Sequence, residues 1–304
     1  MKRAFKQVDV FGATPYFGNP LAVVLDGTGL GDEDMQHFAH WTNLSETCFV
    51  LPATDPLADY RVRIFTPGGE LPFAGHPTLG TCHAWLEAGG IPRSKDFVVQ
   101  ECQYGLVTIR RDCARLAFAA PELKRSAASA ELLRAVAAAL GLDPRNILAS
   151  QLLDNGPQWL GLLLDRAETV LQLEPDHTAL RKLGQKVGVA ALDGVNAVAG
   201  LIARSNREAR AFSSDAARAD LSAPDLQVRA FASPVGVNED PVTGSLNASL
   251  AQWLIADGHL PERYLAAQGL CLGRDGRVHI ERDASGQVWV GGDVVTCVDG
   301  AVRL

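Results

Sequence analysis

The chain lacks the marks of several protein classes. No stretch approaches the ~18 consecutive apolar residues that a membrane-spanning helix needs, so we expect no membrane partner. The six cysteines lie far apart without a Cys-x-x-Cys pair, which disfavours a zinc site or a disulfide framework. Apart from His76, the histidines show no metal-ligand spacing, and residues 27–29 lack the strand and helix that flank a dinucleotide-binding turn. We therefore predict neither a metal nor a cofactor.

The chain also has no run of like charge. Its net charge of −7 and isoelectric point near 5.5 argue against a nucleic acid partner, because phosphates attract basic surfaces. Residues 1–9 carry an early acid and no apolar core, so they do not form a secretory signal. Together with cysteines that we expect to stay reduced, this predicts a cytoplasmic protein.

The sequence contains a repeated pattern. Residues 62–68 (VRIFTPG) resemble residues 228–236 (VRAFASPVG), and each segment leads into a Pro- and Gly-containing turn and then a helical pattern. An earlier pair, GNP at 18–20 and NGP at 155–157, precedes an apolar run in both cases. Three matches in the same order indicate a duplicated unit. Since 304 residues exceed the usual domain of ~100–150 residues, we expect two similar halves that share a cleft.

Short apolar runs bounded by Gly, Pro or Asp predict strands, and longer periodic segments predict helices. The expected strands are 8–11, 21–25, 47–51, 60–65, a late hairpin of 277–282 and 287–290, and a last strand, 294–304, that returns to the first half. The expected helices are 32–40, 77–87, an Ala-rich one ending near 140 with Ser129 as its N-cap, and one carrying Leu246 and Leu254 on one face. This predicts an α+β fold, with half-domains of 1–120 plus 286–304 and of 121–285.

The two Pro- and Gly-containing turns, 74–78 and 239–245, are the candidate functional elements. A Pro at or near the first helical residue would fix each helix start. The first N–H groups of a helix lack partners and lie at the positive end of its dipole. Two such helix ends facing one cleft would hold a carboxylate and stabilise negative charge that develops on it.

Four side chains near these turns could move or hold protons. His76 precedes Pro77, Asp240 follows Glu239, and Ser245 follows Gly244, which lets a ligand approach the backbone closely. Glu46 lies in residues 43–47, just before an expected strand. Simpler roles stay open for each of the four. The His76 and Asp240 side chains could be N-caps, Glu46 a solvated loop carboxylate, and Ser245 a hydroxyl bonded to its own helix backbone.

Together these segments resemble the PhzF-like family, named for the isomerase of phenazine biosynthesis, which has the diaminopimelate epimerase fold. The matching segments are 8–11, 18–24, 43–47, 65–67, 73–80, 239–245, 268–269 and 273–274. The resemblance implies two pseudo-symmetric, strand-rich, barrel-like halves, each wrapped around a central helix, with the active site between them. It also implies a homodimer.

The resemblance further implies roles for individual residues. Glu46 matches the catalytic acid/base of the family, and His76, Asp240 and Ser245 match supporting catalytic residues. The expected substrate-binding residues are Asn19, Gly75, Pro77, Thr78, Thr243 and Gly244, with backbone groups at the two glycines lining a site for the substrate carboxylate.

One departure from the wider fold separates the candidate functions. Epimerases and racemases of this architecture carry a cysteine at the start of each central helix, whereas here Ala74 and the surroundings of Asp240 match those positions. We therefore predict an isomerase that shifts a proton on a small carboxylate-bearing metabolite through Glu46 alone. The alternatives are an epimerase or dehydratase on the same fold and a non-catalytic binder of small acids. Loops at 15–19, 154–159 and 212–215 would set specificity, but they do not identify the substrate.

Overall fold

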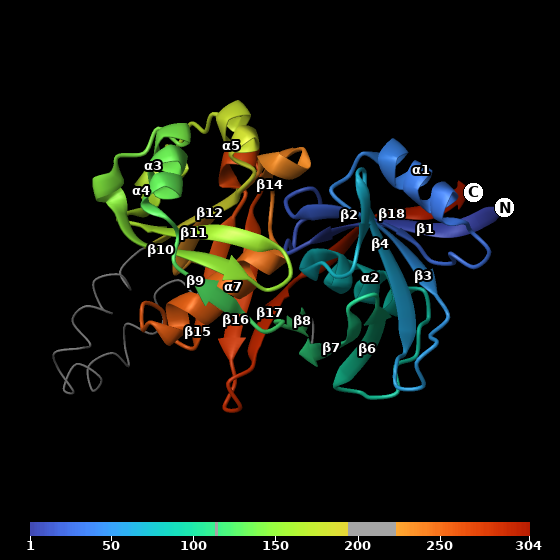
Figure 1. The fold of residues 1–304 in the computed structure, drawn as a ribbon. Coiled ribbons are helices and arrows are strands. Elements are labelled where there is room, and N and C mark those ends of the chain that lie inside the picture. The colour runs from blue at the N-terminus through green and yellow to red at the C-terminus, as the bar shows by residue number, and fades with distance from the viewer. Residues whose placement is uncertain (113–114, 194–222) are drawn as a thin grey trace.

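The computed structural model describes residues 1–112, 115–193 and 223–304, so the predicted specificity loop at 212–215 lies outside the described residues. Figure 1 shows two strand-rich bodies side by side, one containing helix α2 and the other helix α7. The first body contains β1 (Lys2–Val10), β2 (Asn19–Val24), α1 (Asp32–Thr42), β3 (Thr47–Leu51), β4 (Tyr60–Thr66), β5 (Gly69–Leu71), α2 (Gly75–Glu87), β6 (Phe97–Cys102), β7 (Gly105–Asp112) and β8 (Arg115–Ala119).

The second body contains a matching series of elements, with three short helices of its own. These elements are β9 (Lys124–Ser126), α3 (Ala130–Ala139), β10 (Ile147–Asp154), β11 (Gln158–Leu164), α4 (Ala167–Leu171), α5 (His177–Leu183), β12 (Lys186–Leu192), β13 (Leu226–Ala232), β14 (Val237–Asp240), α7 (Gly244–Ala256), β15 (Arg263–Gln268), β16 (Gly276–Arg282) and β17 (Val288–Gly292). The last strand is β18 (Val294–Arg303).

The two bodies share one order of strand pairing. In the first, β1 pairs with β2 and β3 with β4, both antiparallel, while β2–β3 and β4–β6 are parallel. In the second, β10–β11 and β12–β13 are antiparallel, while β11–β12 and β13–β15 are parallel. The predicted α+β fold of two similar strand-rich halves is confirmed, and the common order explains why the sequence patterns repeat.

The central helices are buried because they are apolar or small on nearly all sides, which is typical of a helix enclosed by its own domain. Ten of the thirteen residues of α7 and nine of the thirteen of α2 are buried. The expected Ser129 N-cap is also confirmed, since its hydroxyl accepts a hydrogen bond from the Leu132 N–H at 3.1 Å. Every helix in the described part of the chain is too short or too polar to cross a lipid bilayer.

The starts of both central helices differ from the prediction. Helix α2 begins at Gly75, because the Thr78 N–H already donates to the Ala74 carbonyl, so Pro77 is its third residue. Helix α7 begins at Gly244 with Thr243 as its N-cap, and Pro241 lies in the turn after β14. Pro77 therefore lies near the start of α2, as expected, whereas the expectation was wrong for α7, since Pro241 precedes the helix. Neither His76 nor Asp240 is an N-cap.

The chain crosses between the bodies near its end. Strand β17 pairs with β16 of the second body and with β8 of the first, which joins the two sheets. Strand β18 then pairs with β1 along its whole length, as predicted for the last segment, while β9 pairs with β10 in the second body. Figure 1 shows the chain running from β17 into β18, which lies beside β1. The half-domain boundaries at 120 and 286 stay a prediction.

Candidate active site

The tips of the two central helices are in contact. A Cβ atom added to Gly244 would lie 3.1 Å from the Cα of Gly75 and 3.1 Å from the backbone N of His76. A Cβ added to Gly75 would lie 2.5 Å from the ring of Phe118. Only glycine fits at both positions, and the unpaired N–H groups and positive dipole ends of both helices therefore converge on one place.

We expect Gly244→Ala to lower the free energy of unfolding by about 1–3 kcal/mol, because the added methyl group overpacks the junction between the helix tips. Urea denaturation measures this change. Gly300→Ala is the matched control, since nothing lies within 4 Å of a Cβ at that position and its effect should stay within about 0.5 kcal/mol. Equal effects of the two substitutions would contradict the close contact of the tips.

Glu46 reaches this junction from the residue directly before β3. Its side chain is only 15% exposed, and its Oε2 lies 3.5 Å from Nδ1 of His76, the second residue of α2. Burial raises the pKa of Glu46 to about 7, although a hydrogen bond from Ser45 and the charge of Lys186 oppose the rise. Glu46 is therefore not a solvated loop carboxylate. Its proton can be lost and regained near neutral pH.

Asp240 approaches from the other body, as the last residue of β14. Asn19 Nδ2 donates to its Oδ1 at 2.9 Å, and the Thr243 hydroxyl donates to its Oδ2 at 2.6 Å. Burial raises the pKa of Asp240 to about 6, and the charge of Glu46 adds to the rise. Two buried carboxyl groups from different halves thus share one site, and each disfavours ionisation of the other.

His76 is 4% exposed, and burial lowers its pKa to about 4, while the charge of Asp240 and the Pro20 carbonyl oppose the fall. The imidazole is consequently neutral at pH 7, with one nitrogen that donates and one that accepts. A neutral ring beside two carboxyl groups can hold a polar group of a ligand or pass a proton.

Ser245, the second residue of α7, occupies the position in the second body that His76 occupies in the first. Its hydroxyl oxygen accepts a hydrogen bond from Trp159 Nε1 at 3.3 Å, and its carbonyl accepts one from Asn155 Nδ2 at 3.0 Å. Among the described residues, the Ser245 hydroxyl makes no hydrogen bond to its own helix backbone, so it remains able to donate to a ligand. Asn155 and Trp159 lie in the predicted specificity loop at 154–159, whereas the nearby Lys186 was not predicted from the sequence.

A buried amide network holds the turn before α7. Gln268 Nε2 donates to the Asp240 carbonyl at 2.9 Å and to the Thr243 hydroxyl at 3.0 Å, while its Oε1 accepts from the Thr243 N–H. Asn247 Nδ2 also donates to Gln268 Oε1, at 2.9 Å. Gln268 lies in the segment 268–269, whose match to the family pattern indicated this residue in the sequence. The network fixes the backbone that carries Asp240.

The remaining predicted binding residues differ in what they can contact. The hydroxyl of Thr78 donates to the Ala74 carbonyl at 2.9 Å and accepts from Gln100 Nε2 at 2.9 Å, so it is already engaged inside the helix layer. Pro77 is buried in the same turn. Asn19, in contrast, is fully buried and bridges the halves, because its Nδ2 also donates to the Val242 carbonyl at 2.8 Å. The substrate-binding roles of these residues stay predictions.

Three buried polar atoms around the junction have no hydrogen-bond partner within residues 1–112, 115–193 and 223–304. They are Glu46 Oε2, His76 Nε2 and Asn155 Oδ1. Buried polar atoms are nearly always hydrogen-bonded, so these three atoms are free to bond a ligand at the junction. In the same ranges, no group of three or more His, Cys, Asp or Glu side chains is arranged to hold a metal ion.

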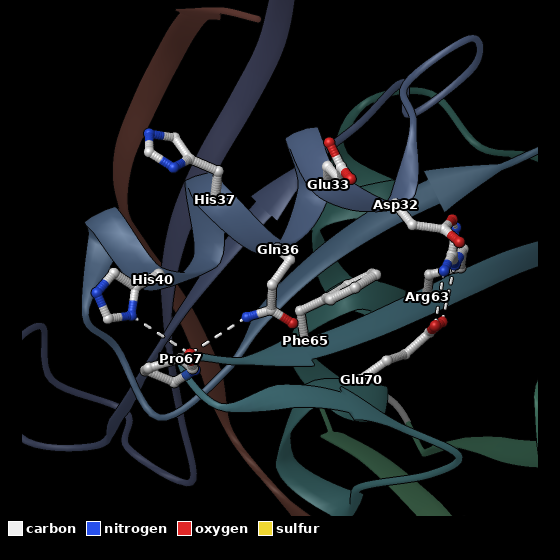
Figure 2. A pocket seen from close by; sticks show the side chains of 9 residues that line it. All are labelled: Asp32, Glu33, Gln36, His37, His40, Arg63, Phe65, Pro67 and Glu70. Carbon is white, nitrogen blue, oxygen red and sulfur yellow. Dashed lines mark hydrogen bonds and ion pairs between the residues drawn. The ribbon is translucent and has the colours of Figure 1, made fainter.

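A surface recess of about 630 Å³ lies elsewhere, against α1 and β4 (Figure 2). Figure 2 shows Arg63 turned toward Asp32 and Glu70, and its guanidinium forms an ion pair of 2.6 Å with each. The recess is shallow and open, and its one arginine is already paired. It includes neither Glu46 nor His76, so the contact of the two helix tips, and not this recess, identifies the candidate active site.

The thiol positions can also be compared directly. The sequence suggested that the counterpart of Ala74 lies around Asp240. The structure shows that it is Thr243, because Ala74 and Thr243 are the N-caps of the two central helices. Neither N-cap carries a thiol. The cysteine nearest in sequence to Glu46 is Cys48, and burial raises its pKa far above the usual range, which makes it unreactive.

Comparisons with known proteins agree with this geometry. The sequence model of the family described as phenazine biosynthesis-like protein matches residues 8–300. Antisense-enhancing sequence 1 of Schizosaccharomyces pombe is 33% identical over 317 residues, and trans-2,3-dihydro-3-hydroxyanthranilate isomerase of Pseudomonas aeruginosa is 32% identical over 311 residues; each match covers 98% of both chains. A PhzF-family protein of Bacillus anthracis has the same fold, with a TM-score of 0.79 at 22% identity over the whole of both chains. The chain therefore belongs to the phenazine biosynthesis-like (PhzF) family and is an isomerase of that family.

Proposed function

We propose that the chain moves a proton between two carbon atoms of a small carboxylate-bearing substrate, with Glu46 as the only general acid/base. The observation that carries this proposal is the buried Glu46 carboxyl, whose pKa is raised to about 7 at the contact of two helix tips. A pKa near the working pH lets one group both take and return a proton. No cofactor is part of the proposed reaction.

The surroundings of Glu46 have matching proposed roles. Backbone N–H groups at Gly75 and Gly244 hold the substrate carboxylate and stabilise enolate-like charge while the proton is on Glu46; one well-placed donor of this kind contributes ~3 kcal/mol. The neutral imidazole of His76 and the carboxyl group of Asp240 orient a polar group of the substrate. The Ser245 hydroxyl donates a hydrogen bond to one of the substrate oxygens. Asn19 and Thr243 hold Asp240 in place through the hydrogen bonds at 2.9 and 2.6 Å.

The absence of a thiol at Ala74 and Thr243 favours one base over two. Inversion at a carbon needs one group to remove a proton and another to deliver a proton from the opposite face. A single carboxyl group instead returns the proton to the face from which it came, at a neighbouring carbon of an unsaturated framework. This favours an isomerase that shifts a double bond over an epimerase.

The relative from Pseudomonas aeruginosa is named for an unsaturated cyclic amino acid, trans-2,3-dihydro-3-hydroxyanthranilate. We propose that the substrate of this chain, like that compound, carries a carboxylate on an unsaturated carbon framework. We further propose a cytoplasmic homodimer, and the five cysteines of the described residues, all unpaired, are compatible with a reducing compartment.

The proposal is tested by incubating the protein with trans-2,3-dihydro-3-hydroxyanthranilate, and then with related unsaturated carboxylates, in heavy water. Proton NMR should show isomerised product with deuterium at the carbon that receives the proton, because the carboxyl proton of Glu46 exchanges with solvent. Co-purified or added carboxylates that bind and stay unchanged, without any deuterium uptake, would favour the non-catalytic binder instead.

The rate should depend on pH in a direction set by Glu46. Only the ionised carboxylate can remove the first proton, and burial has raised the pKa of this group to about 7. We therefore expect kcat/KM to rise as the pH increases through about 7 and to level off above it. A rate that is independent of pH between about 5 and 8, in a protein that stays folded over that range, would contradict the assignment of Glu46 as the base.

A further inference from the structure

The repeated strand pairing gives Glu46 a counterpart in the second body. The residue after Glu46 is the first of β3 and pairs with Phe65 of β4. The residue after Lys186 pairs with Phe231 of β13 in the same antiparallel arrangement. The two phenylalanines are themselves equivalent, because in each body an arginine two residues earlier lies with its guanidinium 5.0 Å from the ring centroid. Lys186 therefore occupies the position of Glu46 in the other half.

Lys186 reaches the same site from the second body. Its ammonium nitrogen lies 4.9 Å from the ring centroid of Trp159, and the indole N–H of Trp159 donates to the Ser245 hydroxyl at 3.3 Å. The lysine is thus connected through one aromatic ring to the first turn of α7. The side chain is partly buried, and among the described residues its ammonium makes no hydrogen bond or ion pair.

The charges around Lys186 match this placement. Burial lowers the pKa of Lys186, whereas the charges of Asp240, Glu46 and Asp154 oppose the fall. Those carboxyl groups are near enough to act on the ammonium through space, yet none of them forms an ion pair with it. A partly desolvated cation that has no anion in contact with it is costly, and a bound carboxylate would supply the counter-charge. The neutral His76 adds no competing positive charge.

We propose that Lys186 is a substrate-binding residue, whose ammonium supplies the counter-charge to the substrate carboxylate that the helix-tip N–H groups hold. The inference rests on the proposed function only in that the substrate carries a carboxylate. It deepens that function, because a lysine in one half at the position that a glutamate occupies in the other gives the pseudo-symmetric site a direction. If the substrate carboxylate points toward Lys186, the carbon framework of the substrate points toward Glu46.

The test compares anthranilate with anthranilamide, which have nearly the same shape and differ in charge. Isothermal titration calorimetry should show that the wild-type protein binds anthranilate about tenfold to a hundredfold more tightly than the amide, the ratio expected of a charge-assisted hydrogen bond. Lys186→Met should reduce this preference at least about tenfold, and Lys186→Arg should retain most of it. Lys182→Met, which removes an exposed lysine of α5, is the control and should leave the preference unchanged.

A purely structural role of Lys186 on Trp159 would weaken the binding of both ligands equally and leave their ratio intact. That result, or a wild-type protein with no preference for anthranilate, would overturn the proposal. The proposed function fails separately, if no unsaturated carboxylate takes up deuterium. In that case a preference for carboxylate that disappears in Lys186→Met still supports the binding role of Lys186. Glu46→Gln should retain the preference whether or not deuterium is taken up.

Discussion

Replacing Glu46 with Gln is expected to lower kcat by about 10²–10⁴-fold, the usual contribution of a general acid/base. The amide keeps the size of the side chain but cannot carry a proton between carbons. Deuterium uptake from heavy water should fall with the rate, because no other group in the proposal returns the proton. Both are measured by NMR on the same substrate.

The stability of this variant distinguishes lost chemistry from lost structure. Burial raises the pKa of Glu46, so above pH 7 the ionised carboxylate makes the folded state less favourable than a neutral group would. Glu46→Gln should therefore melt at or above the wild-type temperature at pH 8. Glu33→Gln on the exposed face of α1 is the control and should change neither property. A Glu46→Gln protein that is folded and turns over at the wild-type rate would remove Glu46 from the mechanism.

Replacing Glu239 with Ala is expected to lower the free energy of unfolding by about 3–5 kcal/mol, because it leaves Arg229 as a buried charge without its carboxylate. The two side chains are 6% and 7% exposed, with Nε–Oε1 and Nη2–Oε2 distances of 2.9 and 2.8 Å. Arg229 Nη1 also donates to the carbonyls of Val170 and Leu173, which keeps it in place. Urea denaturation measures the loss.

The other half of the molecule contains the matched control. Arg63 and Glu70 form the same two-pronged pair between β4 and β5, but their side chains are 22% and 28% exposed. Water already screens this pair, so Glu70→Ala should cost only about 0–1 kcal/mol. Equal costs in the two halves would show that burial does not set the strength of these pairs. Glu239→Ala should also reduce activity, since Glu239 adjoins Asp240 in β14.

The sequence predicted the fold well where the signal was local. The strands of residues 47–51 and 60–65, the Ser129 N-cap and the return of the last strand follow from apolar runs and from turn and cap residues, and the structure has them. The helix starts were misplaced because Pro was given too much weight. Both helices begin at the glycines that contact each other, Gly75 and Gly244, and that contact joins residues far apart in the chain.

The residues that bring the site together were only partly predictable. Glu46, His76, Asp240 and Ser245 lie in short segments that match a family pattern. Lys186 follows no such pattern, because the connection before β12 contains α4 and α5, whereas the one before β3 contains only α1. An alignment of the two halves by residue spacing alone therefore fails in the segments before β3 and β12. Only the hydrogen-bonded register of β12 with β13 shows that Lys186 and Glu46 are equivalent.

The pairing of β18 with β1 also determines the order in which the protein can be completed during synthesis. Lys2 pairs with Arg303, so the sheet of the first half is finished only after β18 has been synthesised. Until then the outer edge of β1 presents unpaired N–H and C=O groups, which readily pair with other chains. A ladder closed over so long a loop forms slowly, so a folding intermediate in which β18 is not yet in place keeps this edge open to aggregation.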